Sequence, residues 1–488
     1  MILSTVLSFL EISATSFPNK TALVFGKNKT TYKELLIASK KIAVFLSSCG
    51  KKDGSVALFM ENSPNWLSAY FGIMASGMTC VPLSLRSSDE NLVSQISLSG
   101  ARFVIVSKKF FPRWNKLVGQ FKNPLKIVEF NTIRISSDKA LKFKSQNPKF
   151  PVILFTSGTT SSQKAVHLSH EAVLASTRNI IDYLKLDYDD IYYAMLPFYH
   201  SFGLGNVHTT LATGGTVIIS NTGTDLRNTL RDIIKYRATF WAATPYTLRI
   251  ATDHFLKDLV LTGKYLRKIC TNTGPMSSEV TKVILKNLPT THFFTYYGLT
   301  EASRTSFLHY NLYPDKLESV GRPSPNVSVC IVNEKNKFLP PQQTGEVCIK
   351  GPHVVGTLRN GWFYTGDAGY FDKDGFLYVT GRKDDRVDIG GEKFSLEEVD
   401  KTLLSCKGVQ DAASFLVKHP RMDFIVGCAV PTSCSNINEK SLRAELLAIC
   451  KKKLGHHQLP SKIIFLDSIP RTDNGKTRRN FLKEKYAG

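Results

Sequence analysis

Small hydroxyl residues around a glycine follow directly after an apolar run at residues 152–155. The residues of this loop are Thr156, Ser157, Gly158, Thr159, Thr160, Ser161, Ser162, Gln163 and Lys164. Backbone N–H groups and hydroxyls in such a loop can donate hydrogen bonds to phosphate oxygens, and the lysine adds a positive charge. The spacing is not G-x-x-x-x-G-K-[ST], which disfavours a standard P-loop NTPase. A loop rich in Ser and Thr is also commonly a solvated turn, so this segment alone leaves both interpretations open.

Further segments follow this loop in a fixed order. They are 197–203 (PFYHSFG), 297–301 (YGLTE), 361–367 (GWFYTGD) with 381–385 (GRKDD), and 470–476 (PRTDNGK). Together with the first loop they resemble the adenylate-forming superfamily, which includes acyl-CoA synthetases, aryl-CoA ligases, beetle luciferases and the adenylation domains of peptide synthetases. The resemblance covers nearly the whole chain. Each segment alone is a weak signal, whereas the ordered set is highly specific.

The resemblance implies a reaction in two steps. A carboxylate attacks the α-phosphorus of ATP and releases pyrophosphate, and a thiol then attacks the acyl-adenylate and releases AMP. The implied cofactors are ATP, Mg²⁺ and coenzyme A, and the implied partner is a small carboxylic acid. The alternative thiol is the phosphopantetheine of an acyl carrier protein, which a strongly basic surface would suit.

The YGLTE segment carries roles that the resemblance implies for three residues. Thr300 would contact the α-phosphate, Glu301 would hold Mg²⁺, and Tyr297 would stack on the adenine. A hard carboxylate oxygen suits Mg²⁺ that is bound together with substrate phosphates. Core packing is the alternative for the tyrosine pair, and it stays plausible for Tyr296.

Several residues of the second half complete the implied site. Asp367 would accept hydrogen bonds from the ribose hydroxyls, because an ionised carboxylate is an acceptor only. Arg382 is expected close to the ribose and phosphate. Lys476 would bridge the carboxylate and the α-phosphate as negative charge builds, although it stands in a Lys-rich tail. Asp384 matches the hinge of a rotating C-terminal domain, and Gly391 would border the pantetheine tunnel, where the absence of a Cβ permits close approach.

The acid pocket is expected around His200 and the segment that contains Gly274 and Pro275, which by resemblance also binds the adenine of the nucleotide. By resemblance, His200 lies near the reacting carboxylate, with a structural histidine as the alternative. This chain has Asn272, Thr273 and Tyr296 at positions where relatives often have glycine, which is smaller. We therefore expect a narrow pocket that favours a short, medium or planar aromatic acid over a long straight chain. No acidic residue follows Phe198, which disfavours an amino-acid substrate.

Some positions depart from the pattern of the relatives. Relatives usually have Gly, Pro and Gly where this chain has Ser161, Gln163 and Ala165. Asp388 stands where many relatives have Lys, and the loop at 357–360 is short. The leading hypothesis is an acid–CoA ligase. The alternatives are an acid–carrier-protein ligase and a binding or scaffold protein with weakened catalysis.

Alternating strand and helix patterns predict the elements that position these residues. Predicted strands are 56–60, 79–83, 103–106, 152–155, 216–219 and 266–270, and a predicted helix spans 65–76. The alternation predicts an α/β fold with a doubly wound, mostly parallel sheet. Short strands at 327–332, 345–350 and 375–380 predict a small antiparallel subdomain, β-barrel-like by resemblance. We place the N-terminal adenylation domain at 1–383 and a small mobile α+β domain at 384–488.

Composition limits the class of protein. The 488 residues include 63 basic and 40 acidic residues, a net charge of +23, which suits small polyanions such as ATP and coenzyme A. No dense basic tract is interleaved with aromatics, which disfavours nucleic acid, and no apolar run of about 20 residues predicts a membrane span.

The nine cysteines lack C-x-x-C spacing, which indicates a reducing cytoplasm. We expect Cys80, Cys330 and Cys348 to be buried, inert thiols, and the first residues to form an amphipathic helix.

Overall fold

The computed structural model describes residues 4–49, 54–156, 164–220, 225–383, 386–389, 392–419, 423–432, 439–471 and 477–487. The chain divides into two compact units. The first comprises Met1–Ser328 with Ile349–Phe363, and the second comprises Val329–Cys348 with Tyr364–Gly488. The predicted division between residues 383 and 384 falls inside the second unit, and it stays a prediction.

A nine-stranded sheet forms one half of the first unit. Its order is β15 (Arg322–Pro323), β14 (Ser306–His309), β13 (His292–Tyr297), β12 (Lys268–Thr271), β11 (Phe240–Ala243), β9 (Ile191–Ala194), β10 (Thr216–Ile219), β1 (Thr21–Phe25) and β2 (Asn28–Thr31). The strands from β13 to β1 run parallel, and β14, β15 and β2 add antiparallel edges. The central strands are buried, as expected where helices cover both faces of a parallel sheet.

A six-stranded sheet forms the other half of this unit. Its order is β6 (Lys126–Glu129), β5 (Ala101–Val106), β3 (Ser55–Phe59), β4 (Thr79–Pro82), β7 (Val152–Thr156) and β8 (Lys164–Leu168). All neighbours are parallel except β7 and β8. The prediction of mostly parallel, doubly wound sheets is therefore confirmed, and each predicted strand overlaps an observed one.

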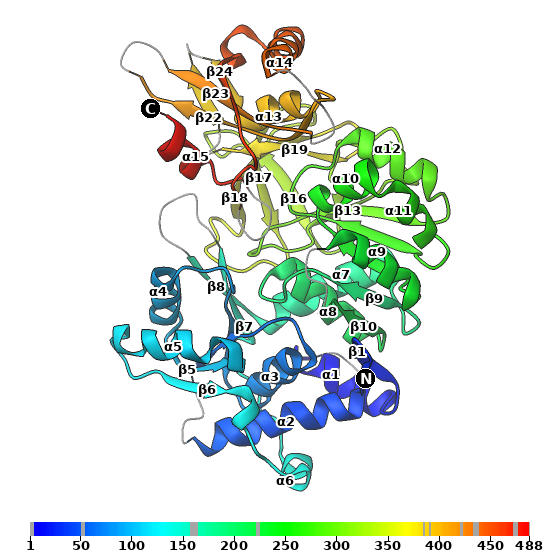
Figure 1. Cartoon of the computed structure of the whole chain (residues 1–488), viewed down its shortest axis with the longest axis vertical. Helices are drawn as coiled ribbons and strands as arrows, with labels where there is room; N and C mark the ends of the chain where they lie inside the picture. Colours follow the sequence, from blue (N-terminus) through cyan, green and yellow to red (C-terminus); the bar gives the residue numbers. More distant parts are fainter. Residues whose placement is uncertain are drawn as a thin grey trace. The chain divides into compact units, whose positions relative to one another are not determined.

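Helices cover and separate the two sheets (Figure 1). The helices of this unit are α1 (Ser8–Ser16), α2 (Tyr32–Ser48), α3 (Pro64–Ala75), α4 (Asp89–Ser99), η1 (Lys108–Phe110), α5 (Phe111–Leu117), η2 (Val118–Gln120), η3 (Phe130–Thr132), α6 (Ser137–Lys142), α7 (His170–Leu184), α8 (Ser201–Ala212), α9 (Leu226–Lys235), α10 (Pro245–His254), α11 (Leu256–Thr262) and α12 (Ser278–Asn287). Helix α3 contacts β3 and β4 of one sheet and β1 of the other, so it lies between them. The first helix begins at Ser8, after the residues from which we expected it to start.

Local signals explain where the central helix begins. Ser63 caps α3, because its hydroxyl accepts the Trp66 N–H, and Pro64 stands at the first position, where a missing N–H costs nothing. Gly72 permits α2 to pass closely, since a Cβ there would lie 2.5 Å from the Ser39 carbonyl oxygen. The helix is buried along almost its whole length, which anchors the apolar core of this unit.

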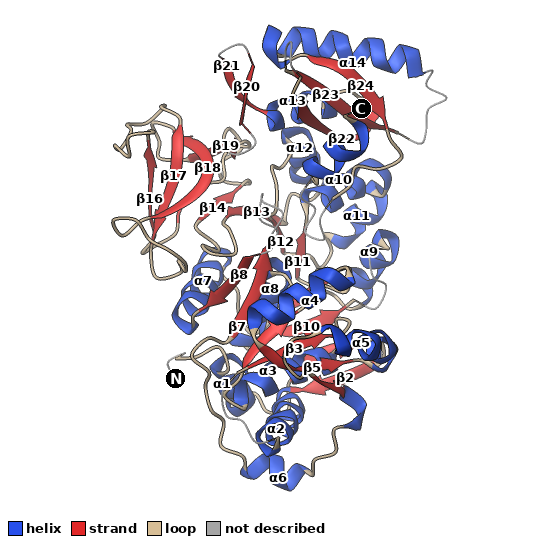
Figure 2. Ribbon diagram, turned by 90° about the vertical axis from the view of Figure 1, so that its left-hand side faces the viewer, coloured by secondary structure: helices blue, strands red, loops and turns tan. Residues whose placement is uncertain are grey.

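The second unit contains a four-stranded sheet in the order β16 (Ser328–Val332), β17 (Gly345–Lys350), β18 (Phe363–Phe371) and β19 (Leu377–Arg382). Its strands are drawn in red beside their labels in Figure 2. Cys348 is buried as expected, but Cys330 is only half-buried, so that part of the cysteine prediction is wrong. A hydrogen bond from the Cys348 thiol lowers the pKa of Cys330 and raises that of Cys348. Burial increases along β16 from the exposed Ser328 to the buried Ile331 and Val332, and Cys330 lies in the part of the strand between them.

A hairpin and an α+β sandwich complete the second unit. The elements are β20 (Arg386–Ile389), β21 (Glu392–Ser395), α13 (Leu396–Leu404), β22 (Val409–Val417), β23 (Phe424–Pro431), α14 (Glu439–Lys453), η4 (His456–Gln458), β24 (Pro460–Phe465) and α15 (Arg479–Tyr486). Ala412 of β22 packs with α13 and α14, whereas the next residue, Ala413, packs with Leu482 of α15. Successive side chains thus face opposite sides of the sheet, and helices cover both (Figure 2).

Candidate active site

Predicted site segments from distant parts of the chain follow the carboxyl ends of parallel strands. His200 follows β9, Gly274 and Pro275 follow β12, and Thr300 with Glu301 follows β13. The strands β9, β11, β12 and β13 are consecutive parallel neighbours. Because the carboxyl ends of parallel strands share one edge of the sheet, these segments lie on the same edge, where open α/β sheets bind ligands.

A tight turn presents Thr300 and Glu301. Leu299 and Ala302 exchange backbone hydrogen bonds of 3.1 and 3.2 Å, which closes the turn around the two residues. The Glu301 carbonyl accepts the Val355 N–H at 2.8 Å, which fixes the turn from outside. Among the described residues, the Glu301 carboxylate has no hydrogen-bond or ion-pair partner, and it is half-exposed. This carboxylate is therefore available to a cation.

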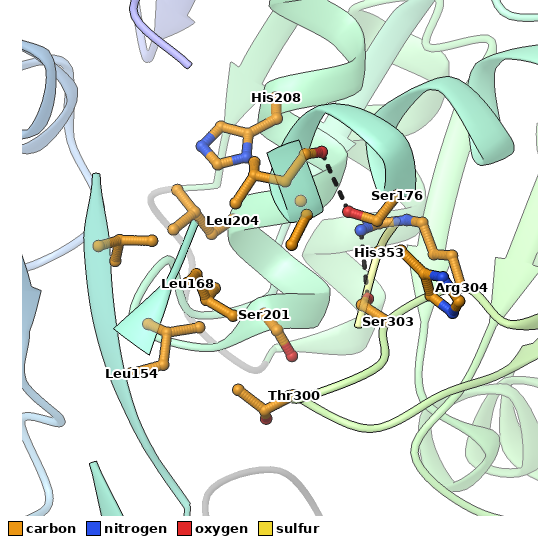
Figure 3. A pocket seen from close by; sticks show the side chains of 14 residues that line it. Leu154, Leu168, Ser176, Ser201, Leu204, His208, Thr300, Ser303, Arg304 and His353 are labelled. Atoms are coloured by element: carbon orange, nitrogen blue, oxygen red, sulfur yellow. Dashed lines mark hydrogen bonds between the residues drawn. The ribbon is translucent and has the colours of Figure 1, made fainter. Parts of the chain in front are cut away.

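A pocket lies beside this turn (Figure 3). Its lining residues are Val152, Leu154, Leu168, Ala172, Val173, Ser176, Ser201, Leu204, Gly205, His208, Thr300, Ser303, Arg304 and His353. They come from β7, β8, α7, α8 and the loops after β13 and β17. The open volume is about 30 Å³, which holds about two water molecules. The pocket is small, and polar groups interrupt its apolar wall.

Two of the polar lining residues, Arg304 and His353, were not expected from the sequence. Arg304 is 2% exposed, and His353 is equally buried. Thr305 Oγ1 lies 3.0 Å from the Ala302 carbonyl oxygen and 3.0 Å from His353 Nε2. The hydroxyl has one proton for the carbonyl, so the imidazole donates from Nε2. Burial lowers the pKa of His353 to about 4, which keeps the ring neutral at pH 7.

His208 is the deepest ionisable neighbour of this pocket. Its Nε2 lies 2.9 Å from the Tyr70 hydroxyl, and the ring is buried. Burial, followed by the positive charge of Arg304, lowers the pKa of His208 to about 3. The ring is therefore neutral at pH 7.

His200 stands at the start of α8 rather than in the wall of the pocket. Its backbone is extended, its carbonyl accepts the Leu204 N–H at 2.9 Å, and its ring centre lies 4.6 Å from that of Tyr199. The next residue, Ser201, lines the pocket instead. A role of His200 near the reacting carboxylate stays a prediction.

The predicted phosphate loop joins two antiparallel strands. Thr156, at the end of β7, pairs in register with Lys164, at the start of β8. Ser157, Gly158, Thr159 and Thr160 lie outside the described residues. Strand β8 was not predicted, because its short run of mixed polarity gives little strand signal.

The segment after β12 and the tyrosines of β13 differ in burial. Gly274 and Pro275 are exposed, and Thr273 has a left-handed φ of 88°. Tyr296 packs between Phe202 and Phe307, with ring centres 5.7 and 5.5 Å away. It is therefore a core residue, the alternative that we kept open. Residues 272, 273 and 296 do not line the pocket of Figure 3, so their narrowing effect stays a prediction.

In the second unit, Asp367 and Arg382 lie together. They face each other on β18 and β19, and Arg382 Nη1 donates to Asp367 Oδ1 at 3.1 Å. The same nitrogen lies 3.2 Å from the Thr365 carbonyl oxygen. Asp367 is 5% exposed, so the ion pair stabilises a carboxylate that is otherwise poorly solvated.

Lys476 and Gly391 lie outside the described residues, as does Asp384. The residues on either side of 472–476 are held together, because Arg471 and Thr477 form an antiparallel bridge. Arg471 also binds Asp411 through two hydrogen bonds of 3.0 and 2.5 Å. This ion pair fixes the base of the segment that carries Lys476.

Two features are absent from the described residues, a membrane-spanning helix and a cluster of metal ligands. No helix among them is long and apolar enough to cross a membrane. No group of three or more His, Cys, Asp or Glu side chains there could hold a metal ion by itself. A metal bound mainly by substrate phosphates and water does not require such a group.

Comparison with known proteins identifies the family. Residues 10–358 match the model of the AMP-binding enzymes, and residues 398–476 match the C-terminal domain of the AMP-binding enzymes. An oxalate–CoA ligase from Arabidopsis thaliana is 29% identical over 521 residues, covering 99% of this chain and 98% of the relative. An oxalate–CoA ligase from Saccharomyces cerevisiae is 31% identical over 377 residues, covering 71% and 67%.

A solved structure shares the fold over the whole chain. The o-succinylbenzoate coenzyme A synthetase from Bacillus subtilis, in complex with ATP and a magnesium ion, has a TM-score of 0.82 and 23% identity. The match covers 98% of this chain and 99% of the other. The likeness shows the fold, and the family models and curated relatives show that the chain belongs to the AMP-binding enzymes, as an AMP-forming enzyme of the acid–CoA ligase family.

Proposed function

We propose that this enzyme joins a small carboxylic acid to the thiol of coenzyme A through an acyl-adenylate, using ATP and Mg²⁺. The observation that carries the proposal is the turn at Thr300 and Glu301. It presents Thr300 to a small pocket and leaves the Glu301 carboxylate without a partner among the described residues. A phosphate acceptor site beside an acid pocket is the arrangement that acid adenylation needs.

The chemistry of Glu301 fits a magnesium ion. Mg²⁺ is commonly held by one or two carboxylates together with substrate phosphates and several waters. When bound, the ion would neutralise charge that develops on the phosphates. Glu301 would hold it, and the hydroxyl of Thr300 would donate to an oxygen of the α-phosphate.

Asp367, Arg382 and Lys476 would complete the chemistry. Arg382 keeps the Asp367 carboxylate charged and oriented through their 3.1 Å ion pair, and this carboxylate would accept from the ribose diol. Lys476 would stabilise the negative charge that builds when the carboxylate oxygen attacks the α-phosphorus. The role of Lys476 rests on its place in the PRTDNGK segment.

Coenzyme A is the proposed thiol because the relatives that match this chain over nearly its full length are named CoA ligases. Their names also support a small acid, since oxalate occurs among them. A carrier protein is the alternative acceptor, supported by the net charge of +23. Release of AMP with coenzyme A, compared with release with a phosphopantetheinylated carrier protein, separates the two.

A hydroxamate-trapping screen tests the proposal. The enzyme is incubated with ATP, Mg²⁺, hydroxylamine and acids of increasing length, and each acyl-adenylate is captured as its hydroxamate. We expect short or medium acids to react faster than palmitate. The K476A variant should lose about 100- to 1,000-fold in adenylation rate, because it lacks a charge that acts mainly in the transition state.

Lys483→Ala is the matched control, since Lys483 is an exposed lysine of the same C-terminal region. It should react like the unsubstituted enzyme. If no acid yields a hydroxamate, and the K476A variant exchanges pyrophosphate no differently from the unsubstituted protein, the chain is a binding or scaffold protein instead.

A further inference from the structure

Arg304 carries a buried positive charge for which the described residues supply no counter-charge. Its side chain belongs to a residue only 2% exposed, and its Nη1 makes one long hydrogen bond, 3.4 Å to Ser303 Oγ. The buried Nε and Nη2 atoms have no hydrogen-bond partner in the described part of the chain. No aspartate or glutamate among the described residues forms an ion pair with it. An arginine does not lose its proton in a protein, so the charge persists.

The surrounding backbone is shaped to hold this guanidinium. A Cβ at Gly205 of α8 would lie 2.2 Å from Nη2, so glycine leaves the guanidinium its present position, from which a larger residue would push it. Arg304 itself has a left-handed φ of 63°, a strained conformation for a residue with a side chain. Its carbonyl is fixed by donors from Asn179 at 3.3 Å and Ser324 at 3.1 Å. The strained backbone of Arg304 is thus held in place by its own loop and by the hydrogen bonds from Asn179 of α7 and from Ser324.

The ionisable groups around Arg304 do not compensate its charge. His208 lies in the same pocket, and Tyr192, Tyr296 and Cys270 are close enough to feel the guanidinium. Burial raises the pKa of Tyr296 and of Cys270 to about 12, so neither becomes an anion at pH 7. The nearest ring is Tyr296, whose centre lies 5.6 Å from the guanidinium carbon. A buried arginine whose described neighbours are all neutral is suited to an anion that a ligand supplies.

We propose that Arg304 binds a second carboxylate of the substrate, and that this enzyme activates a short dicarboxylic acid. The inference rests on the proposed function and names its substrate class. The reacting carboxylate would lie at the Thr300 end of the pocket, and the other carboxylate would meet the planar fork of the guanidinium. The small open volume, about 30 Å³, limits the acid to a short one.

The character of the pocket favours a carboxylate over a phosphate of ATP. Its wall is largely aliphatic, from Leu154, Leu168, Val173 and Leu204, which suits a small organic acid better than a hydrated triphosphate. Figure 3 shows Arg304 among the labelled lining side chains, with Thr300 at the lower edge of the same group. Both anions would pair with a guanidinium, so the experiment includes an arm for each.

Length-matched acids test the inference on the unsubstituted enzyme. Hydroxamate formation is measured with malonate against propionate and with succinate against butyrate, at saturating ATP. We expect at least one dicarboxylate to exceed its partner about 100-fold in kcat/KM, because a site built to bind a polar group strongly rejects the analogue that lacks it. A monocarboxylate preference throughout the series would overturn the inference while leaving the proposed function intact. Hydroxamate from no acid at all would overturn both.

The R304M variant separates recognition of the acid from other roles of Arg304. We expect its kcat/KM for the dicarboxylate to fall about 100-fold and that for the monocarboxylate to stay or rise, with the KM for ATP unchanged. Equal losses with both acids would mean a structural role, and a raised KM for ATP with both acids would mean a phosphate contact. Either result overturns the inference. Arg102→Met, at an exposed arginine of the same unit, is the matched control.

Discussion

Arg479 in the second unit and Arg304 in the first are both largely buried, but their surroundings differ. Arg479 donates to Asp400 at 2.6 Å, and Asp400 also accepts from the Ser414 hydroxyl at 2.6 Å. Arg304 has one long hydrogen bond to a hydroxyl and no carboxylate among the described residues. Arg479 therefore has a counter-charge within the chain, whereas Arg304 has none among the described residues and, by our proposal, meets one in the substrate.

The contrast is not a difference between the two units as such. In the first unit, the buried Asp190 accepts from Lys268 at 2.7 Å and from Arg267 at 3.1 Å. This unit therefore also pairs its buried charges where they serve the fold. Removing one partner of a buried pair leaves an uncompensated charge and destabilises the fold, whereas a buried charge without a partner in the described residues is a candidate for binding a ligand.

Breaking the Arg479 pair should have the largest effect on stability. Arg479→Met leaves the Asp400 carboxylate buried without its counter-charge, and we expect a loss of about 3–5 kcal/mol in the free energy of unfolding. Burial already raises the pKa of Asp400 even with Arg479 present. Urea unfolding of the full chain measures the loss. The double variant with Asp400→Asn should recover part of it, and a loss below about 1 kcal/mol for the single variant would contradict the pairing argument.

The Asp190 cluster should be less sensitive, because it has two cations. Lys268→Met removes the closer one, and we expect a loss of about 2–3 kcal/mol, the range for a hydrogen bond to a charged group. Arg267 remains at 3.1 Å to share the charge of Asp190. Arg267→Met, at a more exposed side chain, is the comparison and should cost less. Equal losses of unfolding free energy for Lys268→Met and Arg267→Met would show that the burial of a cation does not determine how much its ion pair with Asp190 contributes to stability.

Acid should destabilise the first unit through its neutral histidines. The pKa of His208 is lowered to about 3 and that of His353 to about 4, against an ordinary value of 6.5. Below pH 6.5 the unfolded chain binds protons at both sites and the folded chain does not, so stability falls as the pH decreases toward 4. We expect each ring to contribute about 1 kcal/mol of loss between pH 6 and pH 5.

Urea unfolding at several pH values measures this slope. His353→Gln should reduce the slope of the unfolding free energy against pH by the amount that one buried histidine contributes. His456→Gln, at an exposed ring, should leave this slope unchanged. A slope that is the same in His353→Gln as in the unsubstituted protein would show that His353 titrates normally.

Arg304→Met should change stability least, in contrast to Arg479→Met. Replacing an unpaired buried charge by an apolar side chain of similar length is neutral or stabilising, so we expect a change of less than about 1 kcal/mol or a gain. The same urea series measures it. A loss as large as that of Arg479→Met would mean that Arg304 has a structural partner, and the comparison between the two arginines would fail.

The architecture was largely predictable because it follows from local patterns. The apolar run at 56–60 and the capped helix at 65–76 correspond to β3 and α3, which begin and end within one or two residues of the prediction. Buried parallel strands leave a strong signal in sequence, since both of their faces are apolar. The edge strand β8 was missed because its five residues show no regular alternation of polar and apolar side chains.

The site was predictable only in part, and the reason is physical. Thr300 and Glu301 stand in a recognisable segment, and their turn is local in the chain. Arg304 is only three residues beyond Glu301, yet what distinguishes it is that no described carboxylate pairs with it. Its burial depends on the space at Gly205 and on the packing of α7 and α8, which no local pattern encodes.

The close fit of Gly205 against Arg304 also restricts the order in which this pocket could change over evolution. A larger residue at position 205 would place its Cβ 2.2 Å from Nη2 and force the guanidinium out of its present position, so it disturbs the pocket least once the arginine has been lost. Once such a residue has filled the space, a restored arginine at position 304 could no longer take the present position of the guanidinium. A lineage that abandons this arginine and then fills position 205 therefore has to reverse two changes to recover the present pocket.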